Sequence, residues 1–114
     1  MKESVTAIFT QEQNDEQKVF VIFRKEDLRA FPGYMGFPGG KVDKEDHHAD
    51  DFLTHELVSL YEPYLIKALE RELAEEIGFN LEDALQKNII LGIHHLGAFL
   101  STSNSKLGLK IILK

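Results

Sequence analysis

The segment from Tyr64 to Ile77, closed by Gly78, constrains the fold of this chain more than any other. Its residues are strong helix formers, proline at position 63 suits a first helical turn, and glycine suits the position that follows a last turn. Residues three and four positions apart form one apolar stripe along it: Ile66, Leu69, Leu73 and Ile77. The rest of the chain must therefore provide an apolar surface to cover this stripe.

The 114 residues allow one domain and leave no room for a second core. A formal charge of −6 argues against a nucleic-acid or anionic-membrane binder, because both need a basic face, and it suggests cations as partners. The absence of cysteine excludes disulfides, thiolate metal sites and a cysteine nucleophile. No signal-peptide-like segment and no membrane-spanning apolar run is present, so a cytoplasmic location is expected.

The remaining periodicity predicts an α/β chain with strands on both sides of the helix. Gly/Pro-rich residues 30–40 predict a shaped loop, and residues 41–62 predict a loop followed by a short amphipathic helix. The expected strands are Val5–Phe9, a buried strand Val19–Arg24, one or two strands within Ile89–Leu100, and Leu107–Leu113. The expected turns are Gln11–Gln17 and Ser101–Lys106, and a second short helix is expected at Leu81–Lys87.

Three glutamates gather on one quadrant of the long helix: Glu72, Glu75 and Glu76. Like charges at these spacings destabilise a helix by a few tenths of a kcal/mol per pair, and near its C-terminus they oppose the macrodipole. Either a hard divalent cation such as Mg²⁺ offsets this cost, or the face is solvated with Lys67 and Arg71 as partners. The helix alone leaves both readings open.

The loop ahead of the helix adds context, because FPGG at 37–40 and RELAEEIGF at 71–79 resemble the signature of the Nudix hydrolases, Gx5Ex7REUxEExGU, where U is bulky and aliphatic. Phe79 takes the last U. Two departures are present: Asp46 stands where glutamate is expected, and 24 residues (47–70) separate it from Arg71 instead of seven. Residues 47–63 are thus expected to be an insertion that loops out of the motif.

The residues upstream of FPGG resemble the additional pattern of coenzyme A diphosphatases, LLTxR[SA]x3Rx3Gx3FPGG. Arg24, Arg29 and Gly33 match it, whereas its apolar head is only similar. The stretch GGKVDKED at 39–46 also looks like that subgroup, and some of its members carry a long insertion inside the motif. Coenzyme A or acyl-coenzyme A is therefore the first expected substrate.

The resemblance implies a Nudix-type α/β/α sandwich with a mixed sheet, and hydrolysis of a nucleoside diphosphate derivative with Mg²⁺ or Mn²⁺. It implies metal ligands at Gly40, Glu72, Glu75 and Glu76, and catalytic roles for Glu72, Glu75 and an orienting Arg71. Arg71 also suits a plain helix ion pair with Glu75. The implied substrate-binding residues are Arg24, Arg29, Gly33, Phe37 and Gly39. Solvated surface arginines and a Phe37 that packs its own loop are the alternatives.

Weaker candidates are His47, Asp51 and His55, which would share one face if residues 47–55 were helical, and the pair His94–His95. HELVS at 55–59 lacks the second histidine of HExxH, so a zincin site is unsupported. We expect a mobile, solvated lid here more than an accessory metal site.

Other functions remain open: hydrolysis of ADP-ribose, dinucleotides or nucleotide sugars, a Nudix-like domain that binds a nucleotide without cleaving it, and a plain interaction domain. The length gives a further expectation. Nudix domains usually continue with a strand and a helix after the segment that ends here. The last strand would then expose apolar surface, so we predict a single domain, 1–114, that is shortened at its C-terminal end or completed by a second copy in a homodimer.

Overall fold

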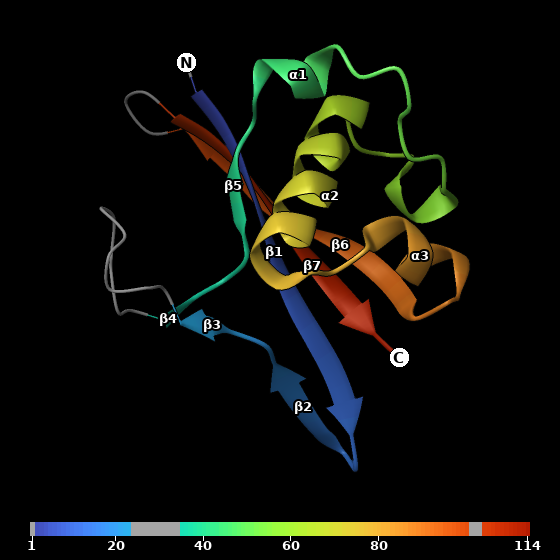
Figure 1. Ribbon diagram of the computed structural model, residues 1–114. Coiled ribbons are helices and arrows are strands. Elements are labelled where there is room, and N and C mark those ends of the chain that lie inside the picture. Colours follow the sequence, from blue (N-terminus) through green and yellow to red (C-terminus); the bar gives the residue numbers. More distant parts are fainter. Residues whose placement is uncertain (1, 24–34, 101–103) are drawn as a thin grey trace.

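The computed structural model describes residues 2–23, 35–100 and 104–114 (Figure 1). The helices are α1 (Lys44–His47), α2 (Pro63–Ile77) and α3 (Leu81–Gln86), with a single 3-10 turn, η1 (Glu56–Val58). The strands are β1 (Lys2–Gln13), β2 (Glu16–Val19), β3 (Ile22–Phe23), β4 (Met35–Gly36), β5 (Gly39–Lys41), β6 (Ile90–Leu100) and β7 (Asn104–Leu113).

One mixed sheet of five strands organises the described chain, with β1 and β7 at its centre. β7 runs parallel to β1 along Lys2–Gln11, and β6 pairs antiparallel with β7. The other side of β1 is shared by two antiparallel partners, β5 opposite Ser4–Thr6 and β2 opposite Thr10–Gln13. β3 and β4 form a separate two-stranded ribbon. The predicted fold class with its mixed sheet is confirmed.

The described helices lie over one face of this sheet, with α2 crossing it and α3 beside α2 (Figure 1). Alternate residues of the central strands point under α2, as the two-residue period of a strand requires. The buried residues that form the core include Val5, Ala7, Phe9, Leu109 and Ile111 from the sheet and Ile66, Leu69, Leu73, Leu81 and Leu85 from the helices. β7, which the sequence left without a cover, is thus covered on this face.

Helix α2 confirms the predicted segment, and Gly78 ends it in the left-handed conformation with φ 65°. Ile66, Leu69 and Leu73 are no more than 2% exposed, but Ile77 is 39% exposed, so its predicted place on the buried stripe is wrong. The chain turns directly after Ile77, and Phe79 takes the place against the sheet. Its ring lies 4.9 Å from that of Phe9, edge to face.

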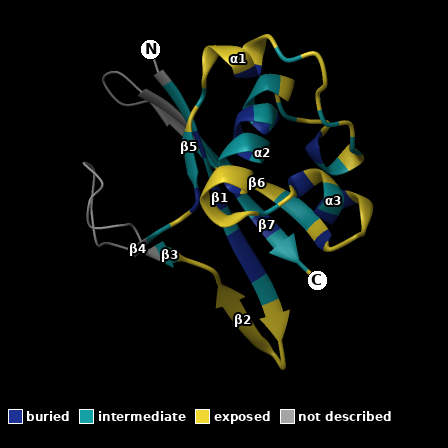
Figure 2. Cartoon of the chain, viewed as in Figure 1, coloured by how far each residue is buried: buried dark blue, intermediate teal, exposed yellow. Residues whose placement is uncertain are grey.

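The prediction of a buried strand at Val19–Arg24 is wrong for its described residues. β2 ends at Val19, and Val19, Phe20 and Val21 are 50%, 46% and 42% exposed. Asn14 and Asp15 both have positive φ, so β1 turns tightly into β2. This hairpin extends past the helical layer, where none of the described elements covers it (Figure 2). The predicted turn is confirmed but is only two residues long. Arg24 lies outside the described residues.

The amphipathic helix expected within residues 41–62 is absent. Its place is taken by the four residues of α1, an irregular stretch and η1. The Nδ1 atom of His55 accepts a hydrogen bond from the amide of Leu57 and so caps η1, while Val58 enters the core. His47, Asp51 and His55 therefore share no helix face.

The C-terminal elements follow the sequence closely. α3 and β6 lie within the predicted ranges, and two register shifts interrupt β6, one of them between His95 and Gly97. β7 begins at Asn104, earlier than predicted, and residues 101–103 of the expected turn lie outside the described residues. That the fold is shortened or completed by a second copy stays a prediction. Within the ranges given above, no helix is long and apolar enough to cross a membrane.

The difference in burial between Leu73 and Ile77 on α2 can be tested by replacing each side chain with that of alanine. Leu73→Ala should lower the free energy of unfolding by about 2–5 kcal/mol, because Leu73 is fully buried and its loss leaves a cavity. Ile77→Ala should cost less than about 1 kcal/mol, because much of that side chain is already in water. Urea unfolding followed by circular dichroism measures both, and equal losses would contradict the assigned orientation of α2.

Candidate functional site

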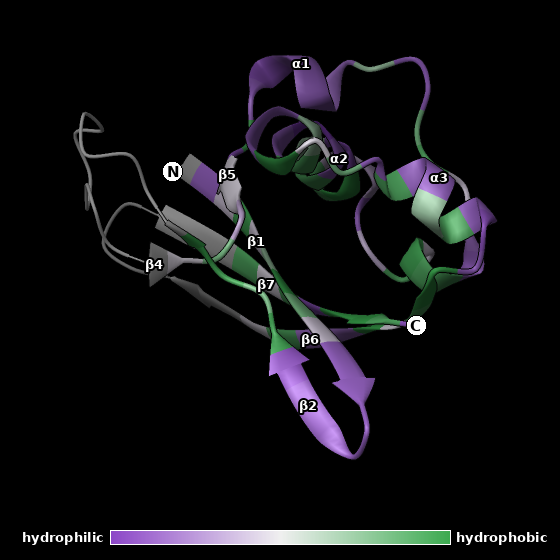
Figure 3. Cartoon of the chain, turned by 60° about the horizontal axis from the view of Figure 1, so that its bottom comes forward, coloured by the Kyte–Doolittle hydropathy of each residue, from purple (hydrophilic) through white to green (hydrophobic). Residues whose placement is uncertain are grey.

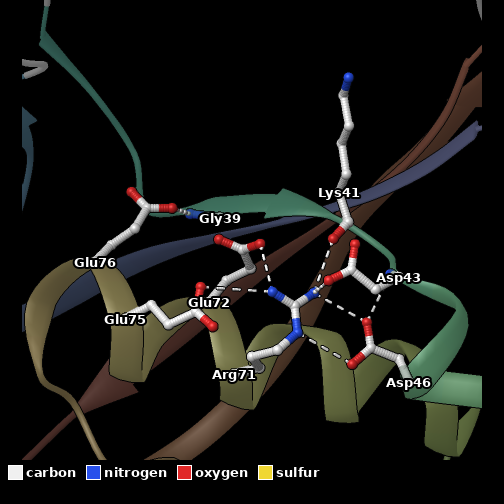
Figure 4. Close-up of polar contacts among 8 residues, drawn as sticks. All are labelled: Gly39, Lys41, Asp43, Asp46, Arg71, Glu72, Glu75 and Glu76. Carbon is white, nitrogen blue, oxygen red and sulfur yellow. Dashed lines mark hydrogen bonds and ion pairs between the residues drawn. The ribbon is translucent and has the colours of Figure 1, made fainter. Parts of the chain in front are cut away.

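The candidate site lies where β5 passes beside α2 (Figure 4). A Cβ atom at Gly40 would overlap the carboxylate of Glu72, and a Cβ atom at Gly39 would overlap the carbonyl oxygen of Val5. The two glycines of FPGG thus allow β5 to fit between β1 and α2. Only a residue without a side chain at position 40 lets a carboxylate of α2 rest directly on the strand.

Arg71 is the centre of the polar contacts at this junction. Its Nε and Nη2 atoms donate to the two oxygens of Asp46 at 3.2 and 3.0 Å, and Nη2 also donates to the carbonyl of Lys41 at 3.0 Å. Its Nη1 donates to Glu72 at 2.9 Å and lies 3.7 Å from Glu75. Arg71 therefore contacts both Glu72 and Glu75, and its role in catalysis stays a prediction.

Asp46 is the main partner of Arg71 and is only 2% exposed. Besides Arg71, it accepts a hydrogen bond from the backbone amide of Asp43 at 2.8 Å. Burial alone would raise the pKa of Asp46, but the hydrogen bonds from Arg71 and Asp43 outweigh burial and hold this pKa below its usual value. Asp46 is thus a fixed anion at ordinary pH.

The contact between Asp46 and Arg71 joins residues 25 positions apart in the chain. Residues 47–63 begin directly after Asp46 and lead into α2, the helix that carries Arg71. The contact between Asp46 and Arg71 therefore holds the two ends of this segment together. Three further contacts tie down the segment and the start of α2. The ring of His47 stacks on Tyr64 at 4.0 Å, the Tyr64 hydroxyl donates to Glu3 at 2.6 Å, and Lys67 donates to Asp51.

Glu72 is half-buried against Gly40. Burial raises the pKa of its carboxyl group, the hydrogen bond from Arg71 opposes this shift, and the neighbouring charges of Glu76 and Glu75 add to it. The repulsion expected from the helical spacing is therefore present in the folded chain. Burial and this repulsion together hold the pKa of Glu72 above its usual value.

The other two predicted ligands are held separately. Glu76 accepts a hydrogen bond from the amide of Gly39 at 3.1 Å, whereas the side chain of Glu75 is 62% exposed (Figure 4). Among the described residues, no three acidic or histidine side chains converge closely enough to form a metal-binding set. The structure gathers Gly40, Glu72 and Glu76 at one place but does not aim their oxygens at one point.

The predicted substrate-binding residues are described only in part. Phe37 is 40% exposed, and Gly39 lies in β5 with its amide bound to Glu76. Arg24, Arg29 and Gly33 lie outside the described residues, so their roles stay predictions.

The sequence did not predict Asp46 as the partner of Arg71, although the spacing of GGKVDKED marked the position as unusual. It also missed the pair Tyr64–Glu3, for which the sequence carries no signal. The hydrogen bond to Glu3 raises the pKa of Tyr64 to about 12, with burial adding to the shift.

No protein-family model matches the chain, and no curated protein matches it by sequence. Solved structures do match it. A NUDIX hydrolase from Alicyclobacillus acidocaldarius is 20% identical with a TM-score of 0.67, and the match covers 98% of this chain and 69% of that one. The NUDIX domain of Shewanella oneidensis NrtR, solved with ADP ribose, is 17% identical with a TM-score of 0.62 over 98% of this chain and 60% of that one. NrtR has also been solved with a 27mer DNA.

A third match is a MutT/nudix family protein from Enterococcus faecalis. It is 16% identical with a TM-score of 0.63, and the match covers 97% of this chain but 36% of that one. The chain therefore spans between about a third and about two thirds of the length of these three structures. At such identities the likeness shows the fold alone, and that fold is the Nudix fold.

The Asp46–Arg71 pair should contribute more to the free energy of unfolding than an exposed ion pair of similar length. Asp46→Asn should lower the free energy of unfolding by about 2 kcal/mol, because it leaves the half-buried guanidinium without its main partner. Asp51→Asn is the matched control: it removes a 3.2 Å pair with Lys67 in which the aspartate is 92% exposed, and should cost no more than about 0.5 kcal/mol. Equal costs would contradict the central place of Asp46.

The same pair predicts a pH dependence. The folded-state pKa of Asp46 is lowered, so its contribution is fully present above the ordinary value of 3.8 and is lost as the pH falls through the lower folded-state value. Unfolding curves of the wild type and of Asp46→Asn should differ at neutral pH and should converge below pH 3.8. A difference that persists unchanged in acid would show that the ionised form of Asp46 is not the source.

Proposed function

We propose that this chain is a Nudix pyrophosphohydrolase that cleaves the diphosphate of a nucleoside diphosphate derivative with the help of a divalent cation. One observation carries the proposal: Glu72 rests on the backbone of Gly40 and is oriented by Arg71. The fold does not imply the function, so the geometry of this site is what supports the proposal.

The residues fit a hard divalent cation by their chemistry. Carboxylate oxygens and a backbone carbonyl are the donors that Mg²⁺ and Mn²⁺ prefer, and phosphate oxygens of a substrate complete such sites. We propose Glu72, Glu75, Glu76 and the carbonyl of Gly40 as the ligands. Glu75 and Glu76 are exposed, so rotation of their side chains brings them toward Glu72 without a change in the core. The bound cation would neutralise phosphate charge and lower the pKa of a water molecule.

The protein groups around the cation would have distinct tasks. Arg71 acts as a positioning residue, because its two hydrogen bonds to Asp46 fix the guanidinium that holds Glu72. Glu72 or Glu75 would accept the proton of the attacking water. We further propose that Arg24 and Arg29 bind phosphate groups and that Gly33, Phe37 and Gly39 shape the substrate site.

For the substrate, coenzyme A or an acyl derivative is our first candidate, with 3′,5′-ADP and 4′-phosphopantetheine as products. The spacing of Arg24, Arg29 and Gly33 ahead of FPGG supports it. ADP-ribose is the second candidate, because the NrtR domain binds it on the same fold. A site that binds such a nucleotide without cleaving it is the third. The DNA complex belongs to the longer NrtR chain, and the charge of −6 argues against DNA as a ligand here.

Removal of one carboxylate tests the catalytic assignment. Glu75→Gln should reduce the turnover of a diphosphate substrate by about a hundredfold or more while thermal unfolding stays near that of the wild type, because the side chain is exposed. Glu82→Gln, an exposed glutamate of α3, is the control and should keep full turnover. Near-normal turnover in the Glu75 variant would contradict its assignment.

A hydrolysis panel with product masses separates the candidate substrates. Coenzyme A, acetyl-coenzyme A, ADP-ribose and a dinucleotide are incubated with saturating Mg²⁺ or Mn²⁺, and chelation of the cation should abolish all turnover. We expect 4′-phosphopantetheine among the products. Turnover of ADP-ribose alone would favour the second candidate, and tight binding without turnover of any compound would overturn the proposed hydrolase.

A further inference from the structure

The two edges of the sheet differ in how they are protected against pairing. One edge is formed by β5, which has only three residues, and by β2, which carries the charged side chains Glu16 and Lys18. The other edge is β6, and among the described strands only β7 pairs with it. An edge strand offers a row of unpaired amides and carbonyls, which folded proteins usually protect with short length, charge, bulges or a covering helix or loop. β6 is eleven residues long and uncharged, and η1 contacts it. Two register shifts interrupt it, so residues 92–95 form the regular stretch between them.

The side chains of β6 are apolar or neutral. Ile90–Leu100 contains none of the 19 acidic and none of the 13 basic residues of the chain. Leu91 and Leu96 are 61% and 51% exposed, and His94 and His95 between them are exposed as well. By contrast, the β1–β2 hairpin on the opposite side is strongly hydrophilic (Figure 3). The surface of β6 thus resembles an interface more than a solvated edge.

We propose that β6 is an interface through which two copies of this chain pair edge to edge as antiparallel strands. A two-fold axis across the stretch 92–96 gives both copies the same contacts and closes the assembly at a dimer. The charges favour a second copy at this place. The chain carries a net charge of −6, and its strands β6 and β7 hold no carboxylate, so two copies approach here without opposing their acidic residues.

This interface is independent of the proposed hydrolase site. β1 and β7 lie between β6 and β5 in the sheet, and Glu72 and Arg71 contact the β5 side. Pairing through β6 therefore leaves the candidate site open. A failure of the interface and a failure of the hydrolase would be seen in different measurements.

A charge placed on the edge tests the proposal. Leu96→Lys puts one positive charge per copy close to the two-fold axis and should weaken the dimer about tenfold or more, as measured by sedimentation over a concentration series. Val19→Lys is the matched control, since Val19 is 50% exposed on the opposite edge, and should leave the association unchanged. Circular dichroism and activity per chain should be unaffected in both variants.

The cysteine-free chain allows a second test that does not depend on destabilisation. Facing residues of an antiparallel pair have Cα atoms about 4.5–5.5 Å apart, within reach of a disulfide. Single cysteines introduced one at a time at positions 92–96 should give a disulfide-linked dimer at one position at least, while Val19→Cys should not. A wild-type chain that sediments as a monomer at every concentration, or equal cross-linking at position 19, would overturn the proposal.

Discussion

The hydrogen bonds between Arg71 and Asp46 are the interaction on which the rest of the site depends. They connect helix α2 to the segment that follows β5, across 25 positions of the chain. A buried carboxylate without such a partner would be costly, and the structure meets this cost with two guanidinium bonds and one backbone amide. The same guanidinium then holds Glu72 against Gly40. Packing, charge and the orientation of the candidate ligand thus depend on one side chain.

Helix α2 has two sides with different requirements. Its apolar side is buried on β1 and β7 and stabilises the fold, while its acidic side gathers three carboxylates that repel one another. Arg71 and the amide of Gly39 offset part of this repulsion. The acidic side adds nothing to the core, and it is the side of α2 on which we propose the cation site.

The sequence predicted what short-range physics determines. The bounds of α2, the left-handed Gly78, the core strands and the turn at Asn14–Asp15 follow from propensity, spacing and turn chemistry. The exposure of Ile77 and of Val19–Val21 could not be predicted, because it depends on where the helical layer ends. The contact between Asp46 and Arg71 could not be predicted, because a long segment of the chain separates the two residues. The amphipathic helix expected within residues 41–62 is absent because a helical rhythm of apolar residues does not by itself form a helix, and only α1 and η1 are helical there.

The place at which a divalent cation binds tests the proposed site most directly. Mn²⁺ is paramagnetic and broadens the NMR signals of nearby amides, so a titration of the isotope-labelled chain maps the site without an assumed substrate. We expect the amides of Gly39, Gly40, Glu72 and Glu76 to be broadened first, at a stoichiometric amount of Mn²⁺, and we expect Glu72→Gln to remove the effect. Broadening that begins instead around Asp51 and Glu82, or that is unchanged in the variant, would contradict the proposed site.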